Sequence, residues 1–471
     1  MNGDSGRVYD LVVIGAGPVG ENVAARARRG GLSVCIVESR LVGGECSYYA
    51  CVPTKAMLRP VHAMVASTRL QGVTPASLAA QGVLDRRDTF TGRGDDSGQV
   101  DWLKSEGIDL VRGHGRITGP RQVSVETSDG QVDLSANHAV ALAVGSSAAV
   151  PPIEGLVEAR PWTNIEASTT LTVPDRLLIL GGGVVACEFA QAFAGLGSSV
   201  TLVERAPRLL GRMEEFAAEL VADGLQEAGV DVRTHKQVES VRREDDGTVT
   251  ATLDDGSPVT ADEVLVGLGR RPNTADLGLE AIGIEPGDYV HADDSLRVPE
   301  VDGGWLYSVG DVNGRNLLTH MGKYQARAAG DVIAARANAE PDDLPGMTAW
   351  ADHTVVTQVI FTEPEVCMVG LTRRAATEKG LPVHSVEVDL SGVTGASLQA
   401  DGYRGTAHVV IDEDRQVVVG ATFVGQDVAE LLHSATIAVA GEVPLERLWH
   451  AVPPFPTISE VWLRALEAYG L

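Results

Sequence analysis

The stretch Asp10-Leu11-Val12-Val13-Ile14-Gly15-Ala16-Gly17-Pro18-Val19-Gly20 decides the fold of the N-terminal part of this chain. Residues 10–14 are continuously apolar after the first position, which predicts a buried parallel strand, and a helix is expected from Glu21 to about Arg29. Residues 33–37 predict a second strand, which Glu38 closes. Strand, glycine-rich turn, helix, strand and acid follow one another in the order that a dinucleotide-binding βαβ unit requires.

The three glycines of this turn have separate roles. Gly15 permits the tight turn, Gly17 lets a pyrophosphate approach the backbone, and Gly20 lets the helix pack against the strand. Glu38 stands where an acid accepts hydrogen bonds from an adenosine ribose. We therefore predict a dinucleotide site here.

The same pattern returns in the middle of the chain. Residues 176–180 predict a strand, the segment 181–186 reads Gly-Gly-Gly-Val-Val-Ala, and a helix is expected over 187–196. Residues 199–203 predict the next strand, which ends in Glu204.

Gly181, Gly183 and Ala186 fill the three positions of this second fingerprint. Two dinucleotide sites in one chain imply two cofactors that exchange electrons, most simply a flavin and a nicotinamide, although a degenerate duplicated domain is the alternative. Glu204 suits the two free ribose hydroxyls of NADH and repels a 2′-phosphate, while Arg205 and Arg208 close behind it would tolerate NADPH. We favour NAD(H).

Cys46 and Cys51 are separated by four residues in the stretch that follows the first βαβ unit. Two thiols next to a redox cofactor predict a pair that stores two electrons as a disulfide. Two unrelated cysteines or half of a metal site are the alternatives, but zinc sites need closer pairs and further ligands, and we predict no metal.

Length, charge and cysteine content limit the class of protein. A chain of 471 residues needs more than one domain, and a net charge of −26 argues against nucleic acid and anionic membrane as partners. No run of 18 apolar residues predicts a membrane span, and residues 1–9 do not resemble a signal peptide. Five cysteines are too few for a secreted disulfide framework, so we expect a cytoplasmic protein.

Ordered motifs along nearly the whole chain resemble the class I pyridine nucleotide–disulfide oxidoreductases, the family of dihydrolipoamide dehydrogenase, glutathione reductase and mercuric reductase. The motifs that carry the resemblance are the first fingerprint, Gly43-Gly44-Glu45-Cys46 with Cys51-Val52-Pro53-Thr54-Lys55, Ala143–Ser146, Gly181–Glu188, Gly269–Thr274, Tyr307–Asp311, Phe361–Glu365, Gly420–Gly425 and Pro456–Glu460.

The resemblance implies roles for the redox residues. Cys51 would lie beneath the flavin ring of FAD, and Cys46 would be the outer thiol that meets substrate. Lys55 would lie near flavin N5 and pair with Glu188, since a buried lysine needs a carboxylate partner.

Further cofactor contacts follow from the same resemblance. On the FAD side they are Gly115, Gly310, Asp311, Leu317 and His320. Asp311, which follows Gly310, would bind the ribityl chain, and His320 matches a segment that contacts flavin through its backbone rather than a catalytic base. On the NAD side Gly269 joins the second fingerprint.

The implied fold is α/β: two doubly wound dinucleotide-binding domains plus a C-terminal α/β dimerisation domain. The expected segments are 1–150 and 275–345 for the FAD domain, 151–274 for the NAD domain and 346–471 for the interface domain. The resemblance implies a homodimer in which each C-terminal motif completes the partner's active site.

The C-terminal motif departs from the family pattern. Phe455 stands where the family has the histidine that acts as general base, while Glu460, which would orient that histidine, remains. Phenylalanine cannot transfer protons, and such help is worth about 10²–10⁴-fold. His450, or one of the tyrosines Tyr48 and Tyr49 between the cysteines, would be a substitute; the tyrosines would otherwise pack as core or line an apolar pocket.

We therefore expect an FAD-dependent oxidoreductase that passes electrons between NAD(P)H, flavin and the Cys46–Cys51 disulfide to an atypical, non-glutathione acceptor or dithiol. One alternative is a tailoring flavoenzyme of specialised metabolism acting on a small or carrier-bound substrate. Another is a non-catalytic FAD-binding redox sensor.

Overall fold

The computed structural model describes residues 7–74 and 77–471. Contacts divide the chain into two compact units: unit 1 comprises residues 1–52, 89–147 and 270–352, and unit 2 comprises 53–88, 148–269 and 353–471. Each unit contains one of the two predicted fingerprints. The four segments expected from the sequence are a different division, and their boundaries stay a prediction.

Unit 1 is built on a seven-stranded sheet in the order β3-β2-β1-β6-β5-β4, with β16 paired to β6. Its strands are β1 (Arg7–Ile14), β2 (Val34–Glu38), β3 (Asp109–Arg112), β4 (His114–Gly119), β5 (Gln122–Thr127), β6 (Gly130–Leu142) and β16 (Leu306–Ser308). Strands β3, β2, β1, β6 and β16 run parallel, whereas β5 and β4 add an antiparallel meander.

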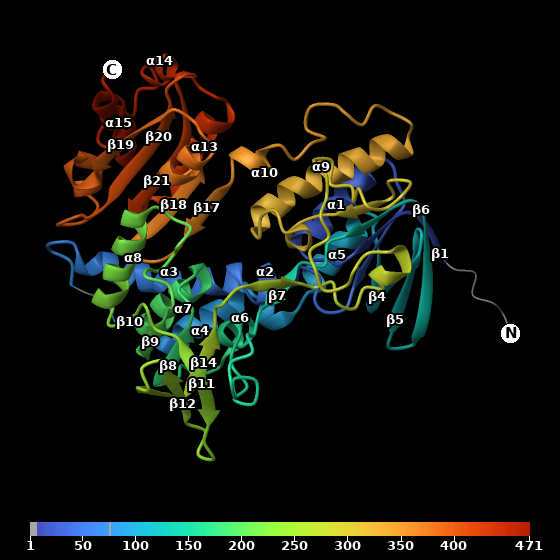
Figure 1. Cartoon of the computed structure of the whole chain (residues 1–471), viewed down its shortest axis with the longest axis horizontal. Helices are drawn as coiled ribbons and strands as arrows, with labels where there is room; N and C mark the ends of the chain where they lie inside the picture. Colours follow the sequence, from blue (N-terminus) through green and yellow to red (C-terminus); the bar gives the residue numbers. More distant parts are fainter. Residues whose placement is uncertain (1–6, 75–76) are drawn as a thin grey trace. The chain divides into compact units, whose positions relative to one another are not determined.

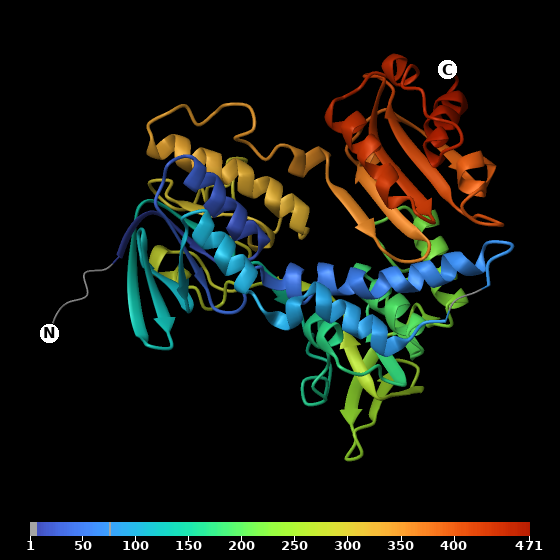
Figure 2. The same ribbon diagram turned by 180° about the vertical axis from the view of Figure 1, so that it is seen from behind.

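The helices of unit 1 include a pair that lies side by side in both views, α1 and α9 (Figures 1 and 2). The helical elements are α1 (Pro18–Arg29), α2 (Gly44–Tyr48), η1 (Gly92–Gly94), α5 (Ser97–Ser105), η2 (Leu279–Ile282), η3 (Asp311–Asn313), α9 (Thr319–Ala337) and α10 (Ala351–Thr354), which ends beyond the unit boundary.

Strand β1 is buried on both faces, as its apolar run predicts. Leu11 and Val13 pack with α1 and α9, while Val12 and Ile14 pack with β4 and β5 on the other face. All four side chains are buried. A central parallel strand covered on both faces is the arrangement of doubly wound folds.

Unit 2 contains three sheets. A parallel sheet has the order β10-β9-β8-β14, a three-stranded antiparallel sheet has the order β11-β12-β13, and a five-stranded antiparallel sheet has the order β17-β18-β21-β20-β19. The strands are β8 (Arg176–Leu180), β9 (Ser199–Val203), β10 (Asp231–Arg233), β11 (Val238–Arg243), β12 (Val249–Leu253), β13 (Pro258–Ala261), β14 (Glu263–Val266), β17 (Thr357–Ile360), β18 (Glu365–Gly370), β19 (Val383–Asp389), β20 (Thr406–Asp412) and β21 (Val417–Gly425). Two short strands, β7 (Ser146–Ala148) and β15 (Arg270–Pro272), pair where the chain passes between the units.

The helical elements of unit 2 are α3 (Cys51–Thr68) and α4 (Ala80–Phe90), which both extend beyond the unit boundary, α6 (Asn164–Thr169), α7 (Val184–Gly195), α8 (Glu215–Glu227), α11 (Arg373–Glu378), η4 (Leu390–Gly392), α12 (Thr394–Ser397), η5 (Ala429–Leu431), α13 (Leu432–Ala440), α14 (Leu445–Leu448), η6 (Ile458–Glu460) and α15 (Val461–Tyr469).

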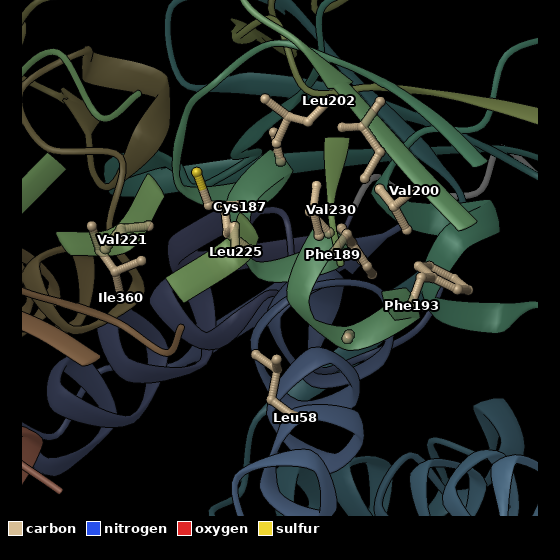
Figure 3. Packing of buried hydrophobic residues seen from close by; sticks show 14 of the residues in the cluster. Leu58, Cys187, Phe189, Phe193, Val200, Leu202, Val221, Leu225, Val230 and Ile360 are labelled. Atoms are coloured by element: carbon tan, nitrogen blue, oxygen red, sulfur yellow. The ribbon is translucent and has the colours of Figure 1, made fainter. Parts of the chain in front are cut away.

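The main core of unit 2 joins segments that are far apart in the sequence. Figure 3 shows Leu58 of α3 pointing toward Phe189 and Phe193 of α7, with Val221 of α8 and Ile360 of β17 in the same cluster. These side chains are buried. The core therefore fixes α3, α7 and the start of the five-stranded sheet as one body.

The α/β fold class is confirmed, and so are the elements around both fingerprints. The helices begin earlier than the periodicity predicts, at Pro18 and Val184 instead of Glu21 and Cys187. Gly17 and Gly183 are the N-caps, so the last glycine or alanine of each fingerprint already lies in the first turn. Among the described residues, no helix is long and apolar enough to cross a membrane.

Candidate active site

The first fingerprint forms the tight turn that its glycines predict. Gly15 has a φ of +102° and its N–H donates to the carbonyl of Val37 at 2.8 Å. A Cβ at Gly15 would lie 2.5 Å from the carbonyl oxygen of Ala143, and a Cβ at Gly20 would collide with the carbonyl of Gly15. Both positions therefore require glycine.

The space in front of α1 suits a pyrophosphate. Gly17 caps the helix in an extended conformation without a side-chain hydrogen bond, and a Cβ there would meet only the Cα of Gly44, at 3.9 Å. The N–H groups of a first helical turn attract anions. Glu38 is held by the N–H groups of Ala16 and Arg40, both at 2.7 Å, in the place of a ribose acceptor. These residues fit FAD.

Three further residues predicted to contact FAD, Gly310, Asp311 and Gly115, also lie in unit 1. Gly310 has a φ of +84° and donates its N–H to Gln325 Oε1 at 2.8 Å, which sets the start of η3. The Asp311 carboxylate accepts from Ser146 Oγ at 2.5 Å, and burial raises its pKa. Gly115 packs on β2, where a Cβ would lie 3.1 Å from Val37 Cγ1.

Leu317 and His320 flank the start of α9 in the same unit. Leu317 is half-buried and His320 is exposed. Their proposed contacts with the flavin stay a prediction.

The second fingerprint repeats the first within unit 2. Gly181 has a φ of +110° and donates its N–H to Val203 at 2.8 Å. Glu204 accepts from the N–H groups of Gly182 at 2.5 Å and Ala206 at 2.7 Å. Gly183 caps α7, and a Cβ there would have a single neighbour within reach, the Gly267 oxygen at 4.0 Å. The geometry suits a second dinucleotide.

Gly269 lies in the loop between β14 and β15. It has a φ of +126° and its carbonyl accepts from Ala149 N at 2.9 Å. Its proposed contact with NAD stays a prediction.

The two candidate redox cysteines flank a short turn. Cys46 lies in α2 and Cys51 is the first residue of α3; both are half-buried. Cys51 Sγ lies 3.5 Å from Thr319 Oγ1 at the start of α9. The chain enters α2 through Gly43 and Gly44, whose φ values are +109° and +60°.

The other three cysteines differ from this pair because they are fully buried. Cys35, Cys187 and Cys367 have no exposed surface. Burial raises the pKa of Cys35 to about 12 and raises the pKa of the other two thiols as well. Thiols held in the protonated form are poor nucleophiles, so these three are packing residues.

Lys55 and Glu188 come together in unit 2. The Lys55 ammonium donates to Glu188 Oε2 at 2.6 Å and lies 5.1 Å from the centre of the Phe361 ring. Glu188 also accepts from the backbone N–H of Phe361 at 3.0 Å. The Glu188 side chain is 4% exposed and that of Lys55 is 33% exposed, so a deeply buried carboxylate holds a partly accessible cation.

Lys55 lines a cavity of about 250 Å³ within unit 2, together with Phe361, His62 and Glu365. Burial raises the pKa of Glu365 to about 7 and lowers that of His62. His62 Nε2 lies 3.1 Å from the carbonyl of Phe361.

The C-terminal segment presents Phe455 to solvent. Its side chain is 73% exposed, and His450 is exposed as well. Glu460 is buried; its Oε1 accepts from Arg464 at 2.6 Å, but its Oε2 has no hydrogen-bond partner among the described residues.

The tyrosines between the cysteines occupy different environments. Tyr48 is 4% exposed and its ring packs in unit 1, while Tyr49 is half-buried. Burial, followed by the nearby acids Asp96 and Glu21, raises the pKa of Tyr48 to about 12.

A charged network that the sequence reasoning missed joins α2 to Asp311. Arg270 donates to Glu45 Oε2 at 2.6 Å, to the carbonyl of Ser146 at 2.5 Å and to Ser146 Oγ at 2.6 Å. Arg270 and Ser146 lie in family motifs, but no periodicity or spacing links them to Glu45, which is 225 residues away from Arg270 along the chain.

Comparison with known families decides the assignment. The profile described as pyridine nucleotide-disulphide oxidoreductase matches residues 9–330, and the dimerisation domain of the same family matches residues 356–466. The chain belongs to the pyridine nucleotide-disulphide oxidoreductases.

Curated relatives of this family align along almost the whole chain. A dihydrolipoyl dehydrogenase of Thermus scotoductus is 32% identical and covers 98% of this chain and 97% of its own. A mercuric reductase of Streptomyces lividans is 31% identical and covers 98% and 96%, respectively.

Solved structures show the same fold at lower identity. The flavoprotein disulfide reductase RclA of Escherichia coli, solved as a Cu(II) complex, has a TM-score of 0.84 at 22% identity and covers 98% of this chain and 99% of its own. LpdA of Mycobacterium tuberculosis has a TM-score of 0.84 at 22% identity, with 99% and 100% covered.

Membership of the pyridine nucleotide-disulphide oxidoreductases confirms the expected class of enzyme, an FAD-dependent oxidoreductase that uses a nicotinamide cofactor. The matched dimerisation domain supports a homodimer. No group of three or more His, Cys, Asp or Glu side chains in the described part of the chain could hold a metal ion.

Proposed function

We propose that Cys46 and Cys51 form the redox-active disulfide of this oxidoreductase, that NADH is the reductant, and that the acceptor or dithiol differs from the usual disulfides of the family. Cys46 is the thiol that meets the acceptor, and Cys51 faces the flavin. When bound, FAD supplies the two-electron carrier between the nicotinamide and the disulfide.

The observation that best supports an unusual acceptor is the lack of a hydrogen-bond partner for Glu460 Oε2 among the described residues. An imidazole at position 455 would need this carboxylate to orient it, but the Phe455 side chain offers no hydrogen-bonding atom, and Glu460 Oε2 has no hydrogen-bond partner among the residues that the structure describes. A thiol exchange that depends on proton transfer at this position would lose about 10²–10⁴-fold in rate.

The Lys55–Glu188 pair also supports the proposed redox role. The buried Glu188 fixes the Lys55 ammonium, which would place a positive charge beside the flavin and stabilise its negatively charged reduced form. The intact Lys55–Glu188 ion pair and two complete fingerprints favour an enzyme over a redox sensor without catalysis.

The geometry around Glu204 supports NADH over NADPH. Two backbone N–H groups, of Gly182 and Ala206, hold its carboxylate at the end of β9, so its negative charge is fixed beside the second fingerprint. A fixed carboxylate accepts hydrogen bonds from the two ribose hydroxyls and repels a 2′-phosphate.

The acceptor we propose is a small oxidant, a quinone or an unusual disulfide. The names of the relatives indicate a dihydrolipoyl group and mercuric ion as substrates of those proteins. The exposed, apolar Phe455 favours an acceptor that requires little proton transfer at this point.

Reduction of the holoenzyme with one equivalent of NADH under anaerobic conditions tests the redox pair. NADH gives up two electrons and one proton, the solvent supplies a second proton, the S–S bond breaks and two thiols form, so two additional cysteines per chain should react with a thiol reagent. The gain should vanish in Cys46→Ser and persist in Cys35→Ser, which alters a buried control thiol. An unchanged thiol count in the natural protein contradicts the proposal.

A second experiment tests the missing base. Phe455→His should raise the rate with lipoamide or a similar disulfide by about tenfold or more, because it restores an imidazole for Glu460 to orient. Phe455→Leu is the matched control and should show no gain. A correctly folded Phe455→His dimer without any gain would mean that the pocket itself excludes such substrates.

A further inference from the structure

Arg270 forms an ion pair with Glu45, the residue that precedes Cys46 in α2. The Glu45 carboxylate accepts from Arg270 at 2.6 Å. Both side chains are 22% exposed, so water screens the pair only in part.

The same guanidinium serves a second carboxylate. Arg270 Nε donates to Ser146 Oγ at 2.6 Å, and Ser146 Oγ donates to Asp311 at 2.5 Å. Arg270 Nε itself lies 3.8 Å from Asp311. Burial raises the pKa of Asp311, while Ser146 and Arg270 act in the opposite direction and Glu45 adds to the rise. One cation therefore balances two acids.

Other elements add further negative charge around α2. Burial raises the pKa of Tyr48 in α2, and the nearby carboxylates of Asp96, Glu21 and Asp95 raise it further. Asp96 is paired with Arg112 at 2.5 Å, so part of this charge is already balanced. Arg270 bonds to α2 directly, through Glu45.

We propose that the Glu45–Arg270 pair is a positioning element that sets the reactivity of Cys46: Arg270 holds α2 in place and favours the thiolate, and Glu45 moderates that effect. The inference rests on the proposed role of Cys46 as the thiol that meets the acceptor. A thiolate next to a guanidinium is stabilised, and a thiolate next to an uncompensated carboxylate is destabilised.

This arrangement predicts changes of opposite sign. Glu45→Gln keeps the shape and a hydrogen-bond acceptor but removes the negative charge on the residue next to Cys46, so Cys46 should react about fivefold faster with iodoacetamide at neutral pH. Arg270→Met removes the positive charge that Glu45 and Asp311 share, so the reaction should be about fivefold slower. Arg270→Lys keeps the charge and should stay near the natural rate, as should the double variant Glu45→Gln/Arg270→Met.

Site-specific labelling of the holoenzyme measures these rates. The cysteine pair is reduced with dithiothreitol, the excess is removed, and peptide mass spectrometry follows alkylation of Cys46, in which the thiolate displaces iodide. Chemical reduction makes the test independent of NADH, so failure of NADH to produce thiols contradicts the proposed function and leaves this result readable. Bound FAD is quantified for each variant, and the buried Cys35, Cys187 and Cys367 are internal controls.

A matched ion pair in unit 2 provides the structural control. Arg243 donates to Glu263 at 2.7 Å, with side chains 25% and 26% exposed. Glu263→Gln and Arg243→Met should leave the Cys46 rate within twofold of the natural protein. Rates for Glu45→Gln and Arg270→Met that move in the same direction, or that match these controls, overturn the proposal; if Arg270→Met loses FAD, the sign of the Glu45→Gln change decides.

Discussion

The two fingerprints form the same turn, but the glycine and the alanine at the contact between helix and strand have exchanged places. In unit 1 Gly20 faces Ala143, whereas in unit 2 Ala186 faces Gly267. A Cβ at Gly20 would lie 3.3 Å from Ala143 Cβ, and a Cβ at Gly267 would lie 3.1 Å from Ala186 Cβ. Each helix–strand contact has room for a single methyl group, and either side can provide it.

The segment after each acid shows where the copies diverge. In unit 1 the N–H of Gly43 donates to the carbonyl of Ala16 at 2.7 Å, and in unit 2 the N–H of Leu210 donates to that of Gly182 at 2.8 Å. The unit 1 loop then continues into α2 with Cys46, whereas the unit 2 loop continues toward α8 without a cysteine. Similar turns are thus followed by different loops, and the loop of unit 1 leads to the candidate redox cysteine.

The largest effect should come from adding a methyl group to the first turn. Gly20→Ala should lower the free energy of unfolding by about 3 kcal/mol or more and reduce bound FAD, because the new Cβ meets the carbonyl of Gly15. Ala186→Gly, its counterpart, should cost only about 1 kcal/mol. Denaturant unfolding and flavin absorbance measure both; equal losses would mean that the two turns are sterically equivalent.

The positions that follow, Glu21 and Cys187, should differ in their pH response. Burial, aided by Glu38 and opposed by Lys323, raises the pKa of Glu21 from 4.5 to about 7. The folded state therefore binds this proton more tightly than the unfolded state, so the contribution of Glu21 is full below pH 4.5 and is lost as the pH rises toward 7. Over that window the free energy of unfolding should fall by about 2–3 kcal/mol.

Glu21→Gln checks this response. Its stability relative to the natural protein should increase between pH 5 and pH 8, measured by denaturant midpoints at each pH. Cys187→Ala should show a constant difference over the same range, because burial raises the pKa of that thiol and keeps it protonated. A constant difference for Glu21→Gln would show that this carboxyl titrates normally.

At the next pair of equivalent positions, Asn22 makes a local contact and Glu188 makes a long-range one. Asn22 donates to Pro18 within α1 at 2.7 Å, whereas Glu188 of α7 bonds to Lys55 of α3. Glu188→Gln should lower the free energy of unfolding by about 2 kcal/mol, at the lower end for a broken buried pair because Lys55 keeps contact with water. Asn22→Ala should cost about 1 kcal/mol or less. Similar losses measured in urea would argue against a special role for the pair.

The smallest effect should come from the acids that end β2 and β9. Glu204→Gln should reduce the ratio of kcat/KM for NADH to that for NADPH by about tenfold, because it removes the charge that repels a 2′-phosphate. Glu38→Gln should leave this ratio unchanged and instead weaken FAD retention. A Glu204→Gln enzyme with the natural ratio would contradict the assignment of the second site.

Local sequence was enough to predict both βαβ units. Strand β8 and strand β9 have the bounds expected from the apolar runs, and both glycine turns and both acids lie where the pattern puts them. The helix starts were less accurate because glycine N-caps and Pro18 at the first helical position begin the helix before the apolar periodicity is visible.

The candidate site was predicted only in part. Cys46, Cys51 and the Lys55–Glu188 pair came from motifs and from the family resemblance, whereas Glu45, Ser146 and Arg270 received no role. Their network depends on which side chains face each other across elements far apart in the chain, and periodicity contains no such information. The unpartnered oxygen of Glu460 likewise requires the packed structure.

The sequence by itself determined the two nucleotide-binding turns, because each depends on steric limits and backbone hydrogen bonds among residues close in the chain. It also determined that Phe455 brings no proton-transferring group to its position. Only the tertiary structure decided which charges are shared: the Arg270 guanidinium between Glu45 and Asp311, and the Glu188 carboxylate under Lys55. Charges removed from water must find partners wherever folding brings them: Glu45 and Arg270 are 225 residues apart along the chain, and Lys55 and Glu188 are 133 apart.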